Sequence, residues 1–154
     1  MGLAPVGKYL ARAGVAIAIV LIAAQLVPIR LSNPPVTGDI AAPGEAGIAL
    51  RGACYDCHSN QTGWPWYAQA APLSWWIARD VEYGRRQVNF SIWNTYYPAT
   101  RLRKLEWIGR SLKQPDMPPK WYRAMHPGAR LTKAQRAALS AWFAGQVAAA
   151  SATQ

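Results

Sequence analysis

The sequence is poor in cysteine and in negative charge. Two cysteines among 154 residues are too few to hold together a small disulfide-rich fold. Seven acidic residues stand against 17 lysines and arginines, so the formal net charge is +10. Hydrophobic residues make up 51% of the chain, which excludes a disordered basic tail. The length leaves room for one small domain and one appendage, and it excludes two catalytic domains.

The basic residues are dispersed along the chain. The two clusters among them are Arg85-Arg86 and Arg101-Leu102-Arg103-Lys104. Because a nucleic-acid interface concentrates its lysines and arginines on one face, we expect no nucleic-acid partner. A basic rim that meets an acidic protein partner or an anionic lipid accounts for the charge at least as well.

A long apolar run lies near the N-terminus. From Ala13 to Ile29 the residues are Ala, Val, Ile or Leu, except for Gly14, Gln25 and Pro28. As a helix, Tyr9–Ile29 would span about 31 Å, which is enough for the hydrocarbon core of a bilayer. This pattern indicates a membrane or export segment.

Residues 1–31 are therefore predicted to be an uncleaved N-terminal membrane anchor. A cleaved signal peptide is the alternative, with Ile22-Ala23-Ala24 as its processing site. Lys8 and Arg12 precede the apolar run while Arg30 follows it, and this charge bias favours a cytoplasmic N-terminus. The rest of the chain would then lie on the periplasmic side of the inner membrane.

After the apolar run, the chain is predicted to divide into a linker and one folded domain. Residues 32–43 are rich in proline and lack a periodic apolar face, so they are expected to be an extended linker. Residues 44–154 are predicted to form an all-α domain, because no segment shows the sustained alternation of a β-sheet. We expect four helices. The first lies at about 44–55, and the second at about 73–88 with Ser74 as N-cap. The third starts after Thr100 and stops before Pro115, and the fourth follows the capping box Thr132-Lys133-Ala134-Gln135.

One motif in the chain is typical of a cofactor site, namely Cys54-Tyr55-Asp56-Cys57-His58. At this Cys-x-x-Cys-His spacing, two thiols form thioethers to the vinyl groups of one haem and the adjacent His ligates the iron. A thioredoxin-like dithiol is one alternative, but the pattern lacks its βαβ scaffold. A structural zinc would need two more ligands, and His58 and His126 are the only histidines. The carbonyl at Pro65 or at Pro72 is the candidate acceptor that orients His58.

The distal iron ligand is predicted to be Met117, since His and Met are the usual axial partners of haem iron. Met117 stands in Asp116-Met117-Pro118-Pro119, where two prolines restrain the loop after a helix has ended. His126 is the first alternative and would give bis-His ligation. Met125 or an open coordination position is the other.

An aromatic-rich stretch follows the motif. Trp64, Trp66 and Tyr67 are expected to form flat apolar walls of a haem pocket and to offer their N–H and O–H groups as donors. Arg79 is expected to pair with a haem propionate, with a solvated place on a helix face as its alternative. Ordinary core packing is the alternative for each aromatic residue.

Further short motifs occur in order along the chain. They are Ser59-Asn60, Trp64-Pro65-Trp66-Tyr67, Ala71-Pro72-Leu73-Ser74-Trp75, Asp80-Val81-Glu82-Tyr83-Gly84-Arg85, Asn89-Phe90-Ser91, Met117-Pro118-Pro119 and His126-Pro127-Gly128-Ala129-Arg130-Leu131. Together with the Cys-x-x-Cys-His motif, they resemble the bacterial haem-binding domain family, over roughly Gly47 to Phe143. The resemblance implies a small, membrane-anchored, cytochrome c-like protein that binds haem c through Cys54, Cys57 and His58, and it favours Met117 as the distal ligand. The segment from Asn94 to Lys104 is more basic than we expect of the family, which leaves the partner open.

We therefore expect an all-α, cytochrome c-like domain that carries one covalent haem c on a single transmembrane helix. It would pass single electrons between redox partner proteins at the periplasmic face, where bacteria attach such haems. With His58 and Met117 as axial ligands and no open position, it is expected to be a carrier and not an enzyme. Two alternatives remain: a haem-bearing accessory subunit of a larger respiratory or photosynthetic membrane complex, and an open-site haem sensor or peroxidase.

Overall fold

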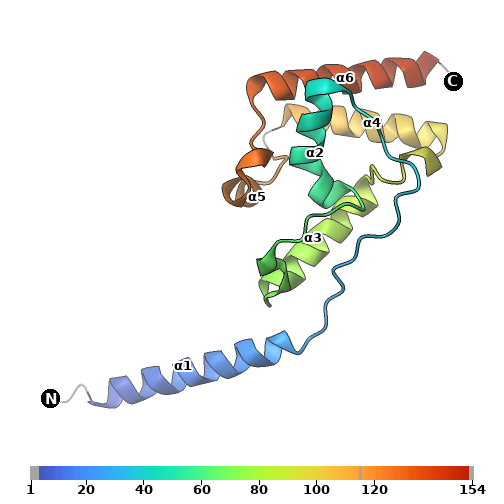
Figure 1. Cartoon of the computed structure of the whole chain (residues 1–154). Helices are drawn as coiled ribbons and strands as arrows, with labels where there is room; N and C mark the ends of the chain where they lie inside the picture. The colour runs from blue at the N-terminus through green and yellow to red at the C-terminus, as the bar shows by residue number, and fades with distance from the viewer. Residues whose placement is uncertain (1–3, 115, 153–154) are drawn as a thin grey trace. The chain divides into compact units, whose positions relative to one another are not determined.

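The computed structural model describes residues 4–114 and 116–152, and its regular elements are helices joined by irregular segments (Figure 1). A single isolated bridge, between Gly38 and Ile92, is the β-pairing recorded among them. The all-α prediction is confirmed. The elements are the helices α1 (Ala4–Gln25), α2 (Gly44–His58), α3 (Leu73–Gln87), α4 (Pro98–Lys113), α5 (Lys120–Met125) and α6 (Lys133–Ala152), with the 3₁₀ turns η1 (Trp66–Gln69), η2 (Trp93–Thr95) and η3 (Pro127–Ala129).

The chain folds as two units. The first comprises residues 4–31 and 64–80, and the second comprises residues 32–63 and 81–152, so that α3 begins in one and ends in the other. In the first unit, Val6–Gln25 of α1 is long and apolar enough to cross a membrane, and none of this stretch is buried. This finding is compatible with the predicted anchor and equally with a signal sequence.

The core of the second unit lies between α2, α4 and α6. Helix α6 packs against both α4 and α2 (Figure 1). Leu50, Leu139 and Phe143 are each at most 1% exposed, and burying side chains of this size contributes about 1.5–3 kcal/mol apiece. These contacts hold α2, and therefore the motif at its C-terminal end, on a rigid support.

Local sequence signals account for most helix ends. Thr132 and Gln135 form the predicted capping box, in which each backbone N–H donates to the other side chain, at 3.0 and 3.1 Å. Helix α4 begins earlier than expected, because Pro98 occupies its first turn. Ser74 was a wrong N-cap prediction: it lies inside α3, where its backbone N–H bonds to the carbonyl of Ala70 at 2.9 Å. Helix α5 is too short to show a periodic pattern and was not expected.

The stretch predicted to be a linker runs along the second unit. The backbone N–H groups of Thr37 and Gly38 donate to the Ser91 carbonyl, and that of Ile40 donates to the Phe90 carbonyl, at 3.0–3.2 Å. The Ile40 side chain is 5% exposed and belongs to the core. Residues 37–40 therefore add to the support of the loops that follow α2 and α3.

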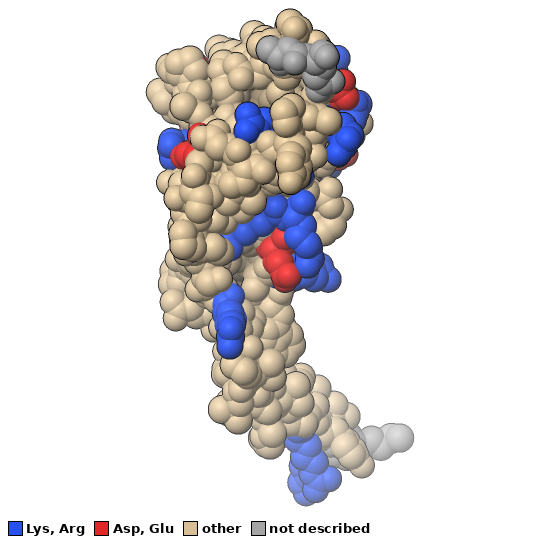
Figure 2. Space-filling view, turned by 90° about the vertical axis from the view of Figure 1, so that its right-hand side faces the viewer, with Lys and Arg blue, Asp and Glu red and all other residues tan. Residues whose placement is uncertain are grey.

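Figure 2 shows lysines and arginines spread over the face in view, with few acidic residues beside them. Several arginines of the chain are paired with acidic side chains. Arg86 lies 2.7 Å from Glu82, and Arg51 lies 3.1 Å from Asp39. The dispersed pattern agrees with the sequence, which showed no concentrated basic patch.

Candidate functional site

The motif Cys54–His58 forms the last turn and a half of α2. Because Cys54 and Cys57 are three residues apart on a helix, their side chains share one face. Both are half-buried thiols. Burial and the neighbouring Cys57 raise the pKa of the Cys54 thiol to about 12, although Arg136 opposes the shift.

These properties argue against the two alternative uses of the cysteines. A dithiol redox centre needs a thiol of lowered pKa, whereas the pKa of Cys54 is raised and its thiol stays protonated near neutral pH. A structural zinc needs four ligands, and within residues 4–114 and 116–152 no three His, Cys, Asp or Glu side chains gather to hold a metal ion. Of the three uses that the sequence suggested for these thiols, covalent attachment to a haem is the one that these properties do not oppose.

His58 is oriented by two backbone carbonyls. Its Nδ1–H donates to the Gly84 carbonyl at 2.9 Å and to the Val88 carbonyl at 3.2 Å. Since Nδ1 carries the proton, the lone pair of the neutral ring lies on Nε2. Burial lowers the pKa of His58, against the two carbonyls, which raise it. The imidazole is therefore neutral at pH 7 with Nε2 available, which is the form of histidine that ligates a metal.

The end of α3 reaches His58 because residue 84 is a glycine. A Cβ at Gly84 would overlap the carbonyl oxygen of Cys57, so α3 and α2 approach through backbone alone. The chain then turns back over the motif, and the Phe90 N–H donates to the His58 carbonyl at 2.7 Å. The prediction that Pro65 or Pro72 supplies the acceptor for His58 was wrong. The contact with Gly84 joins residues 26 apart, for which the local sequence has no signal.

Two aromatic rings flank His58. The sequence analysis gave neither a role at the site, although Phe90 stands in the Asn89-Phe90-Ser91 motif. The ring centroid of Phe90 lies 6.2 Å from that of His58, and that of Trp107 lies 6.5 Å away. Phe90 is itself stacked on Tyr55 at 5.6 Å. These rings keep the surroundings of the imidazole apolar, which agrees with the lowered pKa of His58.

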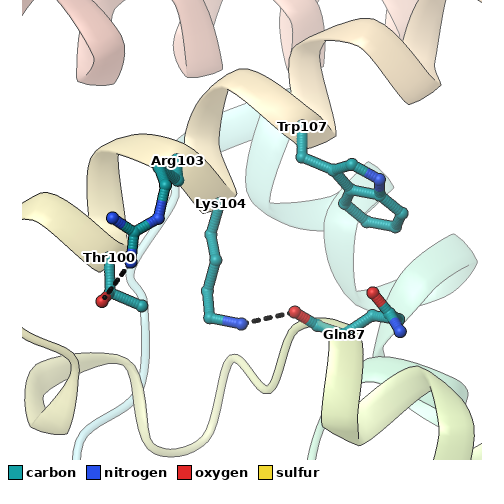
Figure 3. Close-up of a pocket in the computed structure, with 5 residues that line it drawn as sticks. All are labelled: Gln87, Thr100, Arg103, Lys104 and Trp107. Carbon is teal, nitrogen blue, oxygen red and sulfur yellow. Dashed lines mark hydrogen bonds between the residues drawn. The ribbon is translucent and has the colours of Figure 1, made fainter.

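Trp107 also borders a cavity of about 280 Å³ beside the end of α3. Figure 3 shows Lys104 extending toward the backbone carbonyl of Gln87, and Arg103 turned toward the hydroxyl of Thr100. Desolvation lowers the pKa of Lys104. The two cations that line the cavity, Arg103 and Lys104, thus each donate a hydrogen bond to another residue of the lining.

The predicted distal residues lie around α5. Met117 is 37% exposed and precedes the buried Pro118. Met125, at the end of α5, is 49% exposed. His126 is half-buried, and its Nδ1–H donates to the Tyr122 carbonyl at 3.1 Å. The choice of Met117 over His126, Met125 or an open position stays a prediction.

Tyr122 ties this region to the motif, and it is a residue that the sequence analysis missed. Its hydroxyl donates to the Asp56 carboxylate, which lies between the two cysteines. Its ring stacks on that of His126, with centroids 4.1 Å apart and planes 20° apart. The other carboxylate oxygen of Asp56 accepts the Gly63 N–H at 2.9 Å. One acidic side chain thus fastens both α5 and the loop after α2.

The aromatic residues predicted to wall the pocket belong to the first unit. Trp66 is 81% exposed in η1, with its ring edge-on to Tyr67 at 5.7 Å, and Trp64 is half-buried. The side chain of Arg79 is 72% exposed and lies 3.8 Å from Asp80. The role of Trp64, Trp66, Tyr67 and Arg79 around a haem stays a prediction.

Comparison with known proteins gives one finding. Residues 19–145 match a family described as a haem-binding domain. The match includes Cys54–His58, Met117 and His126, together with the last part of α1. No curated protein and no solved structure matches the chain.

Proposed function

The chain belongs to the haem-binding domain family, and from that premise we propose that it is a membrane-anchored monohaem c-type cytochrome that transfers single electrons on the periplasmic side of the inner membrane. The observation that carries the proposal is the orientation of His58. Its Nδ1–H is held by the Gly84 and Val88 carbonyls, which leaves Nε2 for iron directly beside two thiols on one helix face.

The residues present fit a haem of the c type. Cys54 and Cys57 offer two thiols one helical turn apart, and His58 offers a neutral nitrogen next to them. When bound, the haem supplies an iron that alternates between the ferrous and the ferric state. Phe90 and Trp107 exclude water from the His58 ring, which keeps the dielectric constant around this ligand low.

Each residue has a defined part in this proposal. Cys54 and Cys57 form the two thioethers, His58 is the proximal ligand, and Met117 is the distal ligand. With both axial positions filled, the protein takes one electron from a reduced protein donor and passes it to an oxidised protein acceptor. Such an arrangement makes it a carrier and not an enzyme.

Helix α1 retains the protein at the membrane in this proposal. Val6–Gln25 has no buried residue, so its apolar side chains are available to lipid. Lys8 and Arg12 stand at its N-terminal end, which favours a cytoplasmic N-terminus and a periplasmic haem domain.

The test is a reduced-minus-oxidised absorption spectrum, with and without carbon monoxide, of the full chain made with a cytochrome c maturation system. We expect a covalent haem c spectrum that carbon monoxide leaves unchanged. The charge-transfer band of methionine-ligated ferric iron should disappear in Met117→Ala and persist in the matched variant His126→Ala. Absence of covalent haem overturns the proposal, and rapid carbon monoxide binding by the wild type overturns the carrier role in favour of an open-site sensor.

A further inference from the structure

The exposed tryptophans of the chain are gathered in the first unit. Among its eight tryptophans, Trp66, Trp75 and Trp76 are exposed, at 81%, 39% and 38%. The others are buried or half-buried. Leaving large aromatic side chains in water forgoes burial energy of about 25 cal/mol per Å², so such a group on one segment points to a covering surface.

This segment is fastened to the end of the apolar helix. The side-chain amide of Gln25, the last residue of α1, donates to the Ala71 carbonyl at 3.0 Å and accepts the Ala71 N–H at 3.0 Å. The same amide also donates to the Leu21 carbonyl of α1 at 3.0 Å. Gln25 thus satisfies both backbone polar groups of Ala71, which fixes the segment to the terminus of α1.

The length of α1 then sets the depth of the segment in a membrane. The 22 residues of α1 are about 33 Å long, close to the roughly 30 Å hydrocarbon core of a bilayer. Gln25 would therefore lie at the boundary between lipid chains and headgroups. Trp75 lies within α3, four residues after Ala71, and Trp66 begins η1, five residues before it. Five residues reach at most about 18 Å, so both rings stay near that boundary.

Tryptophan is the residue type that favours this location. Its large ring is apolar while its N–H needs a hydrogen-bond partner, and tryptophans are accordingly enriched where a membrane-spanning helix meets water.

We propose that Trp66 and Trp75 insert into the lipid headgroup region next to the end of α1, so that the segment from Trp66 to Trp75 lies on the membrane. The proposal rests on the membrane anchor of the proposed function. It identifies the bilayer as the surface that covers these rings, and it makes Gln25 the residue that positions the segment.

The test uses the full haem-loaded chain, labelled with fluorotryptophan and placed in lipid nanodiscs. Fluorine NMR spectra are compared with and without a lipid that carries a spin label near its headgroup. The Trp66 and Trp75 signals are assigned with Trp66→Phe and Trp75→Phe. We expect the spin label to remove both signals and to leave that of Trp93, which is 8% exposed in the core of the second unit.

The variant Gln25→Leu tests the positioning role. It removes the bonds to Ala71 while keeping the helix apolar, and we expect the Trp66 and Trp75 signals to recover in the presence of the spin label. The control Gln69→Leu changes an exposed glutamine of the same segment, and both signals should still be lost. If the signals stay lost in Gln25→Leu as they do in Gln69→Leu, the positioning role of Gln25 is wrong.

Two further outcomes overturn the proposal. If Trp66 and Trp75 resist the spin label as Trp93 does, while carbonate washing leaves the protein in the membrane, the anchor stands and the insertion of the rings is wrong. Signals that resist the label but shift when the iron is oxidised would place the rings beside the haem instead. If carbonate releases the protein, the anchor in the proposed function fails as well.

Discussion

The two sides of the proposed haem site are built differently. On the His58 side, the imidazole is held by two backbone carbonyls from the end of α3, and its own carbonyl accepts the Phe90 N–H. On the Met117 side, the ligand loop is 37% exposed at Met117, and α5 is joined to the motif through the bond between Tyr122 and Asp56. The proposed proximal ligand is therefore oriented before haem arrives, whereas the predicted distal ligand lies in a partly exposed loop next to α5.

This difference indicates that the two sides of the proposed site have different roles. In the proposed site, the His58 side would set where the iron lies, because backbone bonds allow its ring little movement. The Met117 side would set how firmly the sixth coordination position of the iron is closed. Substitutions on the two sides should therefore separate haem attachment and domain stability from distal ligation.

The largest effect is expected from the thiols. The double variant Cys54→Ala/Cys57→Ala should lose all covalent haem, because no thioether can form. Met117→Ala, on the other side, should keep its haem through denaturing electrophoresis. Haem staining of the gel measures both, and covalent haem in the double variant would falsify the assignment of the thiols.

Arg85 tests the support of the His58 side. Its guanidinium donates to the carbonyls of Ser59 and Ser32, to Asn33 Oδ1 and to Thr62 Oγ1, at 2.7–2.8 Å. At about 0.5–1.5 kcal/mol for each bond, Arg85→Ala should lower the free energy of unfolding by about 2–4 kcal/mol.

Arg86→Ala is the matched control for Arg85→Ala. Arg86 is the next residue on α3, and its exposed pairing with Glu82 at 2.7 Å contributes about 0.3–0.5 kcal/mol. Urea unfolding in mild detergent measures both variants. Equal losses would show that the hydrogen bonds of Arg85 do not support the loop after the motif.

Gly84→Ala sharpens the comparison at the contact between α2 and α3. The added methyl group overlaps the Cys57 carbonyl, so we expect a loss of about 1–3 kcal/mol from overpacking. The control is Gly109→Ala in α4, where no atom lies within 4 Å of the added Cβ. That substitution should stabilise the helix by about 0.5–1 kcal/mol. Thermal unfolding measures both variants. If the two unfolding temperatures shift in the same direction, the close contact at Gly84 does not explain the loss.

The smallest effect on stability is expected on the Met117 side. Tyr122→Phe removes the hydroxyl that bonds to Asp56 but keeps the ring stacked on His126, and it should cost about 1 kcal/mol. The methionine charge-transfer band should be weaker than in the wild type at neutral pH, because α5 holds the distal loop less firmly, while covalent haem is retained. Tyr97→Phe is the control, since Tyr97 is 81% exposed. A band as stable in Tyr122→Phe as in Tyr97→Phe would show that α5 does not hold the distal loop.

Features that depend on neighbouring residues were predictable from the sequence. The Cys-x-x-Cys-His motif is local, and so is the capping box that starts α6. Proline at position 98 and the apolar spacing of α4 are local as well, although α4 begins at Pro98 and not after Thr100 as expected. Such signals act through hydrogen bonds and steric limits within one helical turn. They can therefore be read from the sequence without knowledge of the fold.

The sequence by itself determined the helical class and the apolar N-terminal helix, and it predicted which residues would carry a haem. Only the tertiary structure decided that Gly84 and Val88 orient His58, that Tyr122 bonds to Asp56, and that Ile40 joins the core. The physical reason is separation along the chain. Asp56 and Tyr122 are 66 residues apart, and their contact exists only once α2, α4 and α6 have packed together and brought α5 back to the motif.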